Sequence, residues 1–360
     1  MTWRIHGLES DLGAHKVRWD ALNAELFGAN PYYDTRFIRP LLKHFGTGDE
    51  RLCIHTTGAD IDAMLIAWPS RFPLWSLFVP GQAQIAPILA RDGALLQGLL
   101  RSAGPLVLGL ECPCQDPLSS PLTNLSSTAP VVASNHARTI SVALGSTFEA
   151  YWSARSRDLR KSVSRRMRRV NDAGFSTRLK HITDASEMQD AVRRFGVLES
   201  SGWKGRTGTA VHMDNAQGRF YTDVLSGFAS TGCASVYELY FGADLAAMQL
   251  AIRSSSMLVL LKTSYDERHA ALAPGRLLLH QLLEQEFARA EVRTVEFYTN
   301  AGDEQAAWAT DERWIRHYLV LRNSLVHDLY RVRERLARRS RSNATLASAK
   351  GTNRADTVDA

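Results

Sequence analysis

A turn that follows a short apolar segment has the residues best suited to binding an anion. Residues 257–264 have the composition of a buried strand, and Pro274-Gly275 precedes a leucine-rich, helix-like run. The first amides of a helix lack partners within the helix and carry partial positive charge, so they can bind a phosphate or pyrophosphate. A glycine lets the backbone approach an anion closely. The sequence therefore predicts cofactor-binding residues at Pro274, Gly275, Arg276, Leu277 and Leu278.

Two common nucleotide-binding signatures are missing from the sequence. It has neither the Walker spacing nor Gly-x-Gly-x-x-Gly, which disfavours P-loop nucleotide hydrolysis and Rossmann dinucleotide binding. Acyl-CoA is a natural occupant, because backbone amides can bind its pyrophosphate without a metal. The alternative is an ordinary Pro-Gly turn before a helix, which needs no ligand.

Length and composition indicate a globular protein with two domains. The chain has 360 residues, of which 45% are hydrophobic and 22% charged. It shows no signal-peptide pattern and no apolar run near the roughly 18 residues needed to span a bilayer, so we expect a cytoplasmic protein. The four cysteines are too few for a disulfide framework, and neither they nor the histidines have metal-ligand spacing. We expect free thiols and no metal site.

The positive charge is concentrated in one segment. Residues 155–169 contain eight basic residues and one acid, Asp158, against a net charge of +6 for the whole chain. Apolar residues fall on one face of the predicted helix and basic residues on the other. The basic face is either solvated or binds an anion: a CoA phosphate, an envelope polymer, an acidic membrane surface or nucleic acid. Aromatic residues are not interleaved, which disfavours single-stranded nucleic acid.

Two segments share a pattern, which indicates a tandem duplication. The pattern Gly-Ala-Asp-x-x-Ala-Met-x-x-Ala begins at Gly58 and again at Gly242, an offset of 184 (242 − 58). Each copy follows a strand-like run, so each predicts a hairpin turn. We predict a degenerate N-terminal domain over residues 1–145, a cofactor-binding domain over 146–330 and a disordered tail over 337–360. Residues 105–135 are predicted to be irregular because they are rich in Pro, Ser and Thr.

The second half alternates helical and strand patterns. Helices are predicted at 147–170, 185–200, 215–229 and 304–309, a pair of strands at 235–253, and single strands at 175–181, 257–264, 294–298 and 316–321. This order predicts a mixed α/β layer with a cleft beside a central strand.

Several further motifs resemble those of a known family. They are Leu159-Arg160-Lys161, the run from Glu199 through Trp203-Lys204 to Ala210, Arg219-Phe220-Tyr221, Thr263-Ser264-Tyr265-Asp266, Pro274-Gly275-Arg276 and Glu296-Phe297 with Trp308. The set resembles the CelD-like branch of the GNAT acyltransferases, which is associated with cellulose and exopolysaccharide biosynthesis. The resemblance implies a doubled GNAT fold akin to the FemABX peptidyltransferases, with tandem domains and mixed, mostly antiparallel sheets flanked by helices.

The resemblance also implies an activity and its partners. The expected reaction is direct acyl transfer from acyl-CoA to an amine or hydroxyl of a sugar, amino sugar or cell-envelope precursor. In this fold a backbone N–H of the splayed central strand, here around Leu261, Lys262 and Thr263, polarises the thioester carbonyl. Two alternatives remain: an aminoacyl-tRNA donor, as in FemABX, and a catalytically inactive scaffold in polysaccharide assembly. Peripheral membrane contact is also compatible with the sequence.

The sequence departs from the family pattern at one place that bears on catalysis. Relatives often carry Tyr-Lys before the tryptophan, where this chain has Glu304-Gln305. If that tyrosine protonates the CoA thiolate, another group must do so here, and Tyr298 is the candidate acid. Asp266 is the first candidate for general base, with Glu238 and Glu296 as alternatives. Asp266 could instead cap loop amides. Candidates for acceptor binding are Glu199, Trp203, Lys204, Tyr265 and Glu296.

Overall fold

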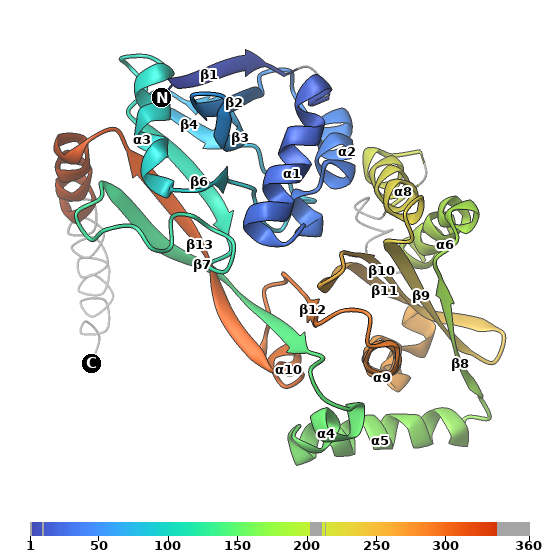
Figure 1. Cartoon of the computed structure of the whole chain (residues 1–360). Helices are drawn as coiled ribbons and strands as arrows, with labels where there is room; N and C mark the ends of the chain where they lie inside the picture. The colour runs from blue at the N-terminus through green and yellow to red at the C-terminus, as the bar shows by residue number, and fades with distance from the viewer. Residues whose placement is uncertain (1, 9–10, 202–210, 213, 337–360) are drawn as a thin grey trace, which may run out of the picture.

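The computed structural model describes residues 2–8, 11–201, 211–212 and 214–336, and its strands form one continuous mixed sheet (Figure 1). The strand order is β1-β2-β3-β4-β6-β13-β7-β12-β11-β10-β9-β8, with β5 beside β3. The strands are β1 (Thr2–Gly7), β2 (Arg51–Thr57), β3 (Asp60–Arg71), β4 (Leu74–Leu77), β5 (Leu89–Ala90), β6 (Gly109–Gln115), β7 (Val131–Ala143), β8 (Thr177–Ile182), β9 (Ala234–Phe241), β10 (Asp244–Arg253), β11 (Met257–Tyr265), β12 (Thr294–Glu296) and β13 (Asp311–Leu321).

The two halves repeat one plan, as the shared sequence pattern predicts. Gly58 and Gly242 turn the β2–β3 and β9–β10 hairpins, and both have a positive φ that favours glycine. In each half one more strand extends the hairpin, β4 in the first half and β11 in the second. A parallel strand lies beside it, β6 beside β4 and β12 beside β11. The sheet is otherwise antiparallel, so the expected tandem fold with a mixed, mostly antiparallel sheet is confirmed.

The halves exchange their last strands. β13, from the end of the chain, pairs with β6 of the first half, while β7, from the first half, pairs with β12 of the second. β7 and β13 also pair with each other and run through the centre of the molecule (Figure 1). Strands therefore cross the boundary near residue 145, and that boundary stays a prediction.

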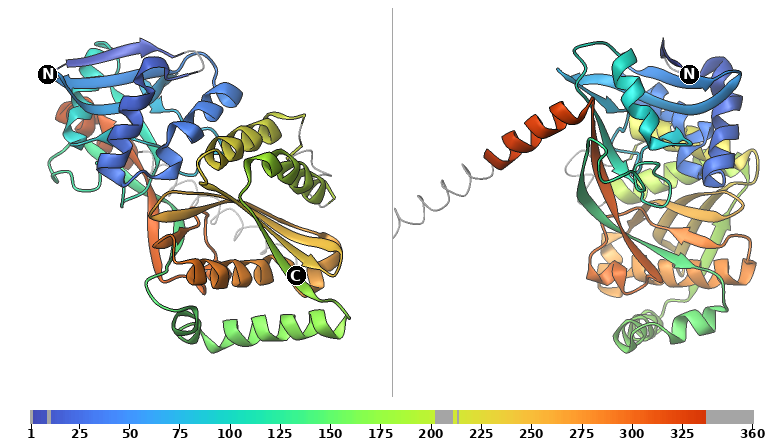
Figure 2. Two further views of the ribbon diagram at one scale, coloured as in Figure 1. Left: turned by 45° about the vertical axis from the view of Figure 1, so that its right-hand side comes forward. Right: turned by 60° about the vertical axis from the view of Figure 1, so that its left-hand side comes forward.

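Helices cover the faces of the sheet and link its halves. The labelled α-helices are α1 (Lys16–Phe27), α2 (Thr35–Phe45), α3 (Leu96–Ser102), α4 (Phe148–Ser153), α5 (Arg157–Asp172), α6 (Met188–Ser200), α8 (Ala216–Ala229), α9 (Pro274–Arg289) and α10 (Asp303–Ala306), and residues 324–336 are also helical. The 3-10 helices are η1 (Gly13–His15), η2 (Pro31–Tyr33), η3 (Gly93–Leu95), η4 (Ala185–Glu187) and η5 (Glu267–Leu272). In the second half, α6 and α8 lie on one face of the sheet and α9 on the other, with α5 packed outside α9 (Figure 2).

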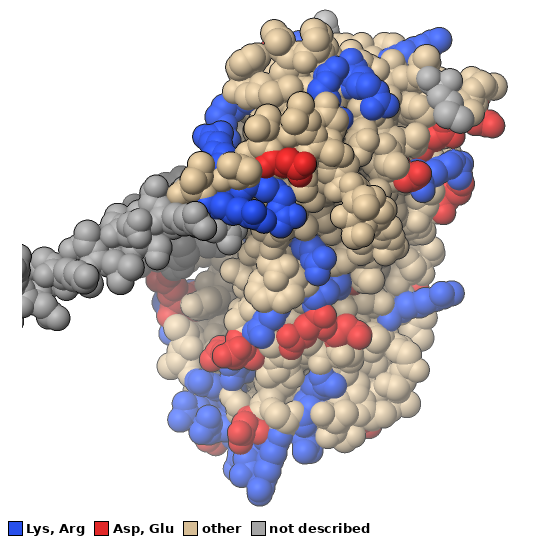
Figure 3. Space-filling view, turned by 90° about the vertical axis from the view of Figure 1, so that its left-hand side faces the viewer, with Lys and Arg blue, Asp and Glu red and all other residues tan. Residues whose placement is uncertain are grey.

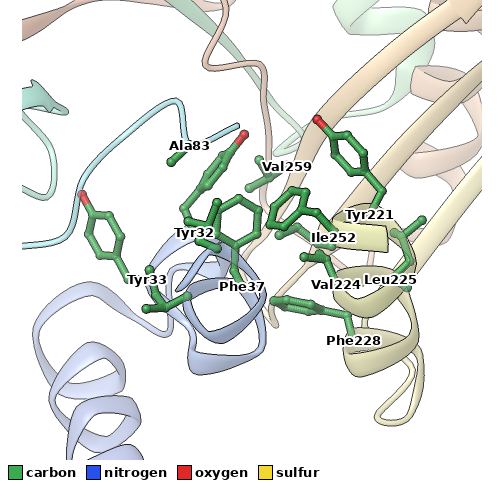
Figure 4. Packing of buried hydrophobic residues seen from close by; sticks show 14 of the residues in the cluster. Tyr32, Tyr33, Phe37, Ala83, Tyr221, Val224, Leu225, Phe228, Ile252 and Val259 are labelled. Carbon is green, nitrogen blue, oxygen red and sulfur yellow. The ribbon is translucent and has the colours of Figure 1, made fainter. Parts of the chain in front are cut away.

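A buried apolar cluster spans both halves. Phe37 of α2 lies edge-on to Phe220 of α8, with ring centroids 5.5 Å apart. Figure 4 shows Phe37 beside Val224 and Phe228 of α8, with Tyr32 next to them. This packing ties α2 to α8, so the halves share a core and do not meet across a solvated linker.

Two expectations about individual elements were wrong. The helix predicted at 147–170 is two helices, because Ser156 leaves the helical conformation and its side chain caps α5 by accepting a hydrogen bond from the Leu159 amide at 3.2 Å. The irregular segment predicted at 105–135 contains β6. Pro113 lies within that strand, at the β-bulge where the β6–β13 register shifts and Cys114 adopts a positive φ.

Candidate active site

The central feature of the second half is the point where β11 and β12 part. Their parallel pairing covers Met257 to Val259 opposite Thr294 to Glu296 and then stops. The β10–β11 register passes from Leu250 opposite Lys262 to Ala251 opposite Leu260, which makes Leu261 the bulged residue. The splay and the bulge together open the sheet beside Leu261, Lys262 and Thr263.

This opening forms a cleft of about 570 Å³. Its lining combines side chains from β11, the N-terminal turns of α9, and α10 with its flanking loops. The lining residues are Gln249, Leu260, Leu261, Lys262, Thr263, Tyr265, Gly275, Arg276, Leu278, Leu279, Leu282, Phe297, Thr299, Glu304, Gln305 and Trp308. Six of the eight predicted cofactor residues are in this set. The other two, Pro274 and Leu277, are buried beside it.

The N-terminus of α9 opens onto this cleft. Ala273, the residue before the helix, has a left-handed conformation, and among the described residues no side chain caps the helix. The amides of Arg276 and Leu277 reach back only to the Ala273 carbonyl, at 3.1 and 3.3 Å. A Cβ on Gly275 would meet the Tyr265 ring at 4.0 Å. Packing therefore does not demand glycine, and the amides of this first turn remain suited to an anion.

Arg276 places a positive charge at the same end of the cleft. Its Nη1 donates to Ser162 Oγ of α5 at 2.6 Å, and its Nη2 lies 3.0 Å from Glu304 Oε2 of α10. Arg166 of α5 donates to the Ala271 carbonyl of η5, just before α9. The basic helix predicted from sequence thus contacts the N-terminal end of α9 through Ser162 and Arg166. Glu304 and Gln305, which replace Tyr-Lys of the family pattern, line the cleft from α10.

Lys262 connects the cleft with a buried carboxylate on α6. Lys262 Nζ lies 3.1 Å from Glu199 Oε2, and the Glu199 carboxylate also accepts a hydrogen bond from the Val211 amide at 2.8 Å. The ammonium group lies 5.8 Å from the centroid of the Tyr221 ring. Glu199 and Tyr221 are both buried. The predicted acceptor residue Glu199 is therefore outside the cleft lining, but it contacts Lys262, which lines the cleft, from the α6 side of the splayed strand.

Two of the predicted catalytic acids are bound to arginines and do not line the cleft. Asp266 caps η5 and pairs with Arg268, with an Oδ2–Nη2 distance of 2.6 Å. The hydrogen bonds from Arg268 lower the pKa of the Asp266 carboxyl. Glu238 is fully buried, 2.7 Å from Arg194 Nε, and accepts a hydrogen bond from the Tyr240 hydroxyl at 2.8 Å. The geometry of Asp266 is therefore that of a capping residue, which is the alternative to a role as general base.

Glu296 and Tyr298 lie at the junction of the two halves and do not line the cleft. Arg313 of β13 donates to Glu296 at 2.8 Å and to Asp116 at 2.7 Å, and so links carboxylates from the two halves. Burial raises the pKa of Glu296 to about 7, although Arg313 opposes the shift. Tyr298 is buried with its ring 5.4 Å from that of Tyr32, and burial raises its pKa well above the ordinary value.

Sequence reasoning missed several residues of the site. Gln249 lies opposite Thr263 on the neighbouring strand, and its amide nitrogen donates to the Lys262 carbonyl at 3.1 Å. Its position directly after the Met of the repeated Gly-Ala-Asp-x-x-Ala-Met-x-x-Ala pattern was a usable signal, because that pattern predicts β10. No sequence pattern of this kind marks Thr299. Trp203 and Lys204 lie outside the described residues, so their predicted acceptor contacts stay predictions.

The described part of the chain contains neither a candidate metal-binding cluster nor a helix that could span a membrane. No group of three or more His, Cys, Asp or Glu residues there could hold a metal ion. None of the helices described is long and apolar enough to cross a bilayer. The four cysteines are free, as expected.

Residues 157–309 match the family model described as the acetyltransferase (GNAT) domain, a span of less than half of the chain. The match includes the whole cleft lining. It shows that the chain carries a GNAT acetyltransferase domain and confirms the prediction of an acyltransferase. No curated protein matches the sequence.

Solved structures share the fold over most of the chain. The structure of FemX has a TM-score of 0.56 at 9% identity, covering 87% of this chain and 98% of FemX. The L-PGS structure from Bacillus licheniformis has a TM-score of 0.53 at 14% identity, covering 88% and 93%. The C-terminal domain of a putative lysylphosphatidylglycerol synthetase from Agrobacterium fabrum has a TM-score of 0.52 at 13% identity, covering 88% and 95%. At these identities the likeness concerns the fold alone.

Proposed function

We propose that this chain transfers an acyl group directly from acyl-CoA to an amine or hydroxyl acceptor. The observation that carries the proposal is the cleft between β11 and β12, with the uncapped N-terminus of α9 at one end. Such a turn supplies backbone amides and a helix dipole for a diphosphate. A splayed strand supplies main-chain groups to an extended acyl-pantetheine arm. The matched GNAT domain supports this assignment.

The donor would lie along the cleft from phosphates to thioester. The diphosphate would bind the Gly275 amide and the Arg276 guanidinium, which would exchange its exposed partner Glu304 for phosphate. The pantetheine arm would run between Leu261 and Phe297, which line opposite sides of the opening. The thioester carbonyl would accept a hydrogen bond from the backbone around the Leu261 bulge.

The acceptor would approach from the side of Glu199 and Lys262. The acceptor nitrogen or oxygen attacks the thioester carbon, the carbon–sulfur bond breaks, the acceptor loses a proton and the CoA thiolate gains one. We assign removal of the acceptor proton to Glu199, which is buried behind the cleft and lies 3.1 Å from Nζ of the cleft-lining Lys262. Asp266 is disfavoured because it caps η5 and pairs with Arg268, and neither residue lines the cleft. Tyr265 lines the cleft and is partly exposed, so we assign it, in place of the buried Tyr298, as the acid on sulfur.

The proposed acceptor is a sugar, amino sugar or cell-envelope precursor. This part of the proposal comes from the resemblance to the CelD-like branch, carried by Trp308 and the Pro274-Gly275 turn among other residues. Both features line or border the observed cleft. Acetyl-CoA and longer acyl-CoAs are the donors to compare.

A second candidate is transfer from aminoacyl-tRNA. The observation that favours it is the basic face of α5, whose Arg160, Lys161 and Arg165 help to line a separate surface hollow, together with a fold shared with FemX. A polyanion along that face would release counterions, so its binding would weaken steeply with salt.

Isothermal titration with acetyl-CoA, longer acyl-CoAs and tRNA distinguishes these candidates. The first proposal predicts heat on addition of acyl-CoA and release of free thiol when an amino sugar is added. No acyl-CoA binding at millimolar ligand, with salt-sensitive tRNA binding, would support the second candidate instead. Acyl-CoA binding without turnover on any acceptor tested would favour the inactive scaffold.

A further inference from the structure

The helical residues 324–336, here called the C-terminal helix, expose an apolar stripe to solvent. Leu325, Leu329, Val332 and Leu336 are 69%, 63%, 52% and 57% exposed. Their spacing of four, three and four residues places them on one side of the helix. The right-hand view of Figure 2 shows this helix, in red, projecting away from the sheet. A large exposed apolar stripe marks an interaction surface.

The opposite side of the helix faces the protein. His327 and Tyr330, with Arg331, Glu334 and Arg335 at the edge of this side, line a hollow against residues 131–133 at the start of β7. The polar side of the helix therefore faces the protein, and its apolar side faces solvent. This is the reverse of the orientation expected for a helix that contributes to the core.

Arginines flank the apolar stripe on both sides. At 100° per residue, Arg335 lies on one side of the stripe and Arg333 on the other, with Arg331 beyond Arg335. Residues 331–341 contain six arginines and one acid, Glu334. Figure 3 shows Lys and Arg next to uncharged side chains where the described chain meets the grey segment. An apolar stripe edged with arginine is typical of helices that lie in the interface of an anionic bilayer.

Further exposed apolar side chains occur at the end of the sheet from which this helix leaves. Phe72 is 78% exposed and Leu106 is 66% exposed. Their loops are joined to the start of the helix by main-chain hydrogen bonds, from Leu108 to the Pro73 carbonyl at 2.9 Å and from Arg322 to the Leu108 carbonyl at 3.0 Å. Phe72, Leu106 and Leu325 therefore belong to one end of the molecule.

We propose that the C-terminal helix, with Phe72 and Leu106, binds the surface of an anionic lipid bilayer. The arginines would lie at the headgroups and the apolar stripe at the acyl boundary. A second copy of the chain is disfavoured on two grounds. The concentrated positive charge would repel itself, and four side chains bury far less than the roughly 1,200 Å² of a stable interface. This inference does not depend on the acyl-transfer reaction.

Vesicle flotation of the full-length protein tests the proposal. The vesicles contain phosphatidylcholine alone or with about one-third phosphatidylglycerol. We expect binding only to the anionic vesicles, weakened by salt and reduced at least about tenfold in the double variant Leu329→Glu/Val332→Glu. The matched control is Val197→Glu, on α6, which replaces a side chain that is equally exposed at 68%. It should bind like the wild type.

Several outcomes would overturn the proposal. Equal binding of the wild type and the double variant would show that the stripe is not the lipid-binding surface. Equal binding to neutral and anionic vesicles would show that the arginines do not contribute to binding. If no vesicle binds, but sedimentation shows a dimer that the double variant abolishes, a second copy covers the stripe. Unchanged melting temperatures for both variants would exclude misfolding as the cause.

Discussion

Gly275 connects a single residue with donor binding. Because its Cβ position lies 4.0 Å from the Tyr265 ring, a larger residue fits the protein but projects where the diphosphate would bind. We predict that Gly275→Val weakens acetyl-CoA binding at least about tenfold, while changing the free energy of unfolding by less than about 1 kcal/mol. Titration calorimetry and urea unfolding measure the two effects. Gly145→Val, at a position with open space around its Cβ, is the control.

Glu199 should affect the chemical step more than donor binding. If its carboxylate removes the acceptor proton, Glu199→Gln lowers kcat by roughly 10²–10⁴ and leaves the acetyl-CoA dissociation constant nearly unchanged. Glu286→Gln is the control, since Glu286 is also a buried carboxylate but bonds to Tyr237 away from the cleft. Unchanged kcat for Glu199→Gln would assign the base elsewhere.

Glu296 makes stability depend on pH in a definite direction. Burial raises its pKa from 4.5 to about 7 in the folded state, so the folded state binds the proton more tightly. Its contribution to stability is therefore present below about pH 4.5 and is lost as the pH rises through about 7. We predict that the free energy of unfolding of the wild type falls by up to roughly 3 kcal/mol relative to that of Glu296→Gln as the pH rises from about 4.5 to about 7. Urea unfolding at the two ends of this pH range measures the difference. Stability profiles that run parallel with pH for the two proteins would contradict the prediction.

At the scale of elements, α5 is amphipathic as its sequence predicts. Val163 is buried beneath the helix, whereas Arg165 is exposed. We predict that Val163→Ala destabilises the protein by about 1–2 kcal/mol, and that Arg165→Ala changes stability by less than about 0.5 kcal/mol. Thermal and urea unfolding provide the comparison. Similar effects of the two substitutions would mean that the burial pattern of α5 is different.

The same scale shows what the sequence could and could not predict. Local patterns gave the two Gly-Ala-Asp hairpins and the strand–turn–helix around Gly275, because each depends on neighbouring residues. β6 was missed, since Pro113 lowers strand propensity and only the bulge opposite β13 accommodates it. Arg313 was missed for another reason: its partner Asp116 lies 197 positions away, and nothing local marks the contact. Long-range pairing of this kind is invisible to periodicity.

At the scale of the whole molecule, the strand exchange makes the halves interdependent. The core of the first half includes Tyr318 and Val320 of β13, and the cluster between α2 and α8 belongs to both halves. We predict that residues 1–145 expressed alone do not unfold cooperatively, because β6 loses its partner strand. Circular dichroism during urea unfolding tests this. A cooperative transition of the fragment would show that the first half is an independent domain.

The central claim is that the N-terminus of α9 and the splay of β11 from β12 hold acyl-CoA. A crystal structure of the protein with acetyl-CoA tests it most directly. We predict the diphosphate within hydrogen-bond distance of the Gly275 amide and the Arg276 guanidinium, with the thioester beside Leu261. Acetyl-CoA bound at any other surface, or a cleft left empty at millimolar ligand, would contradict it.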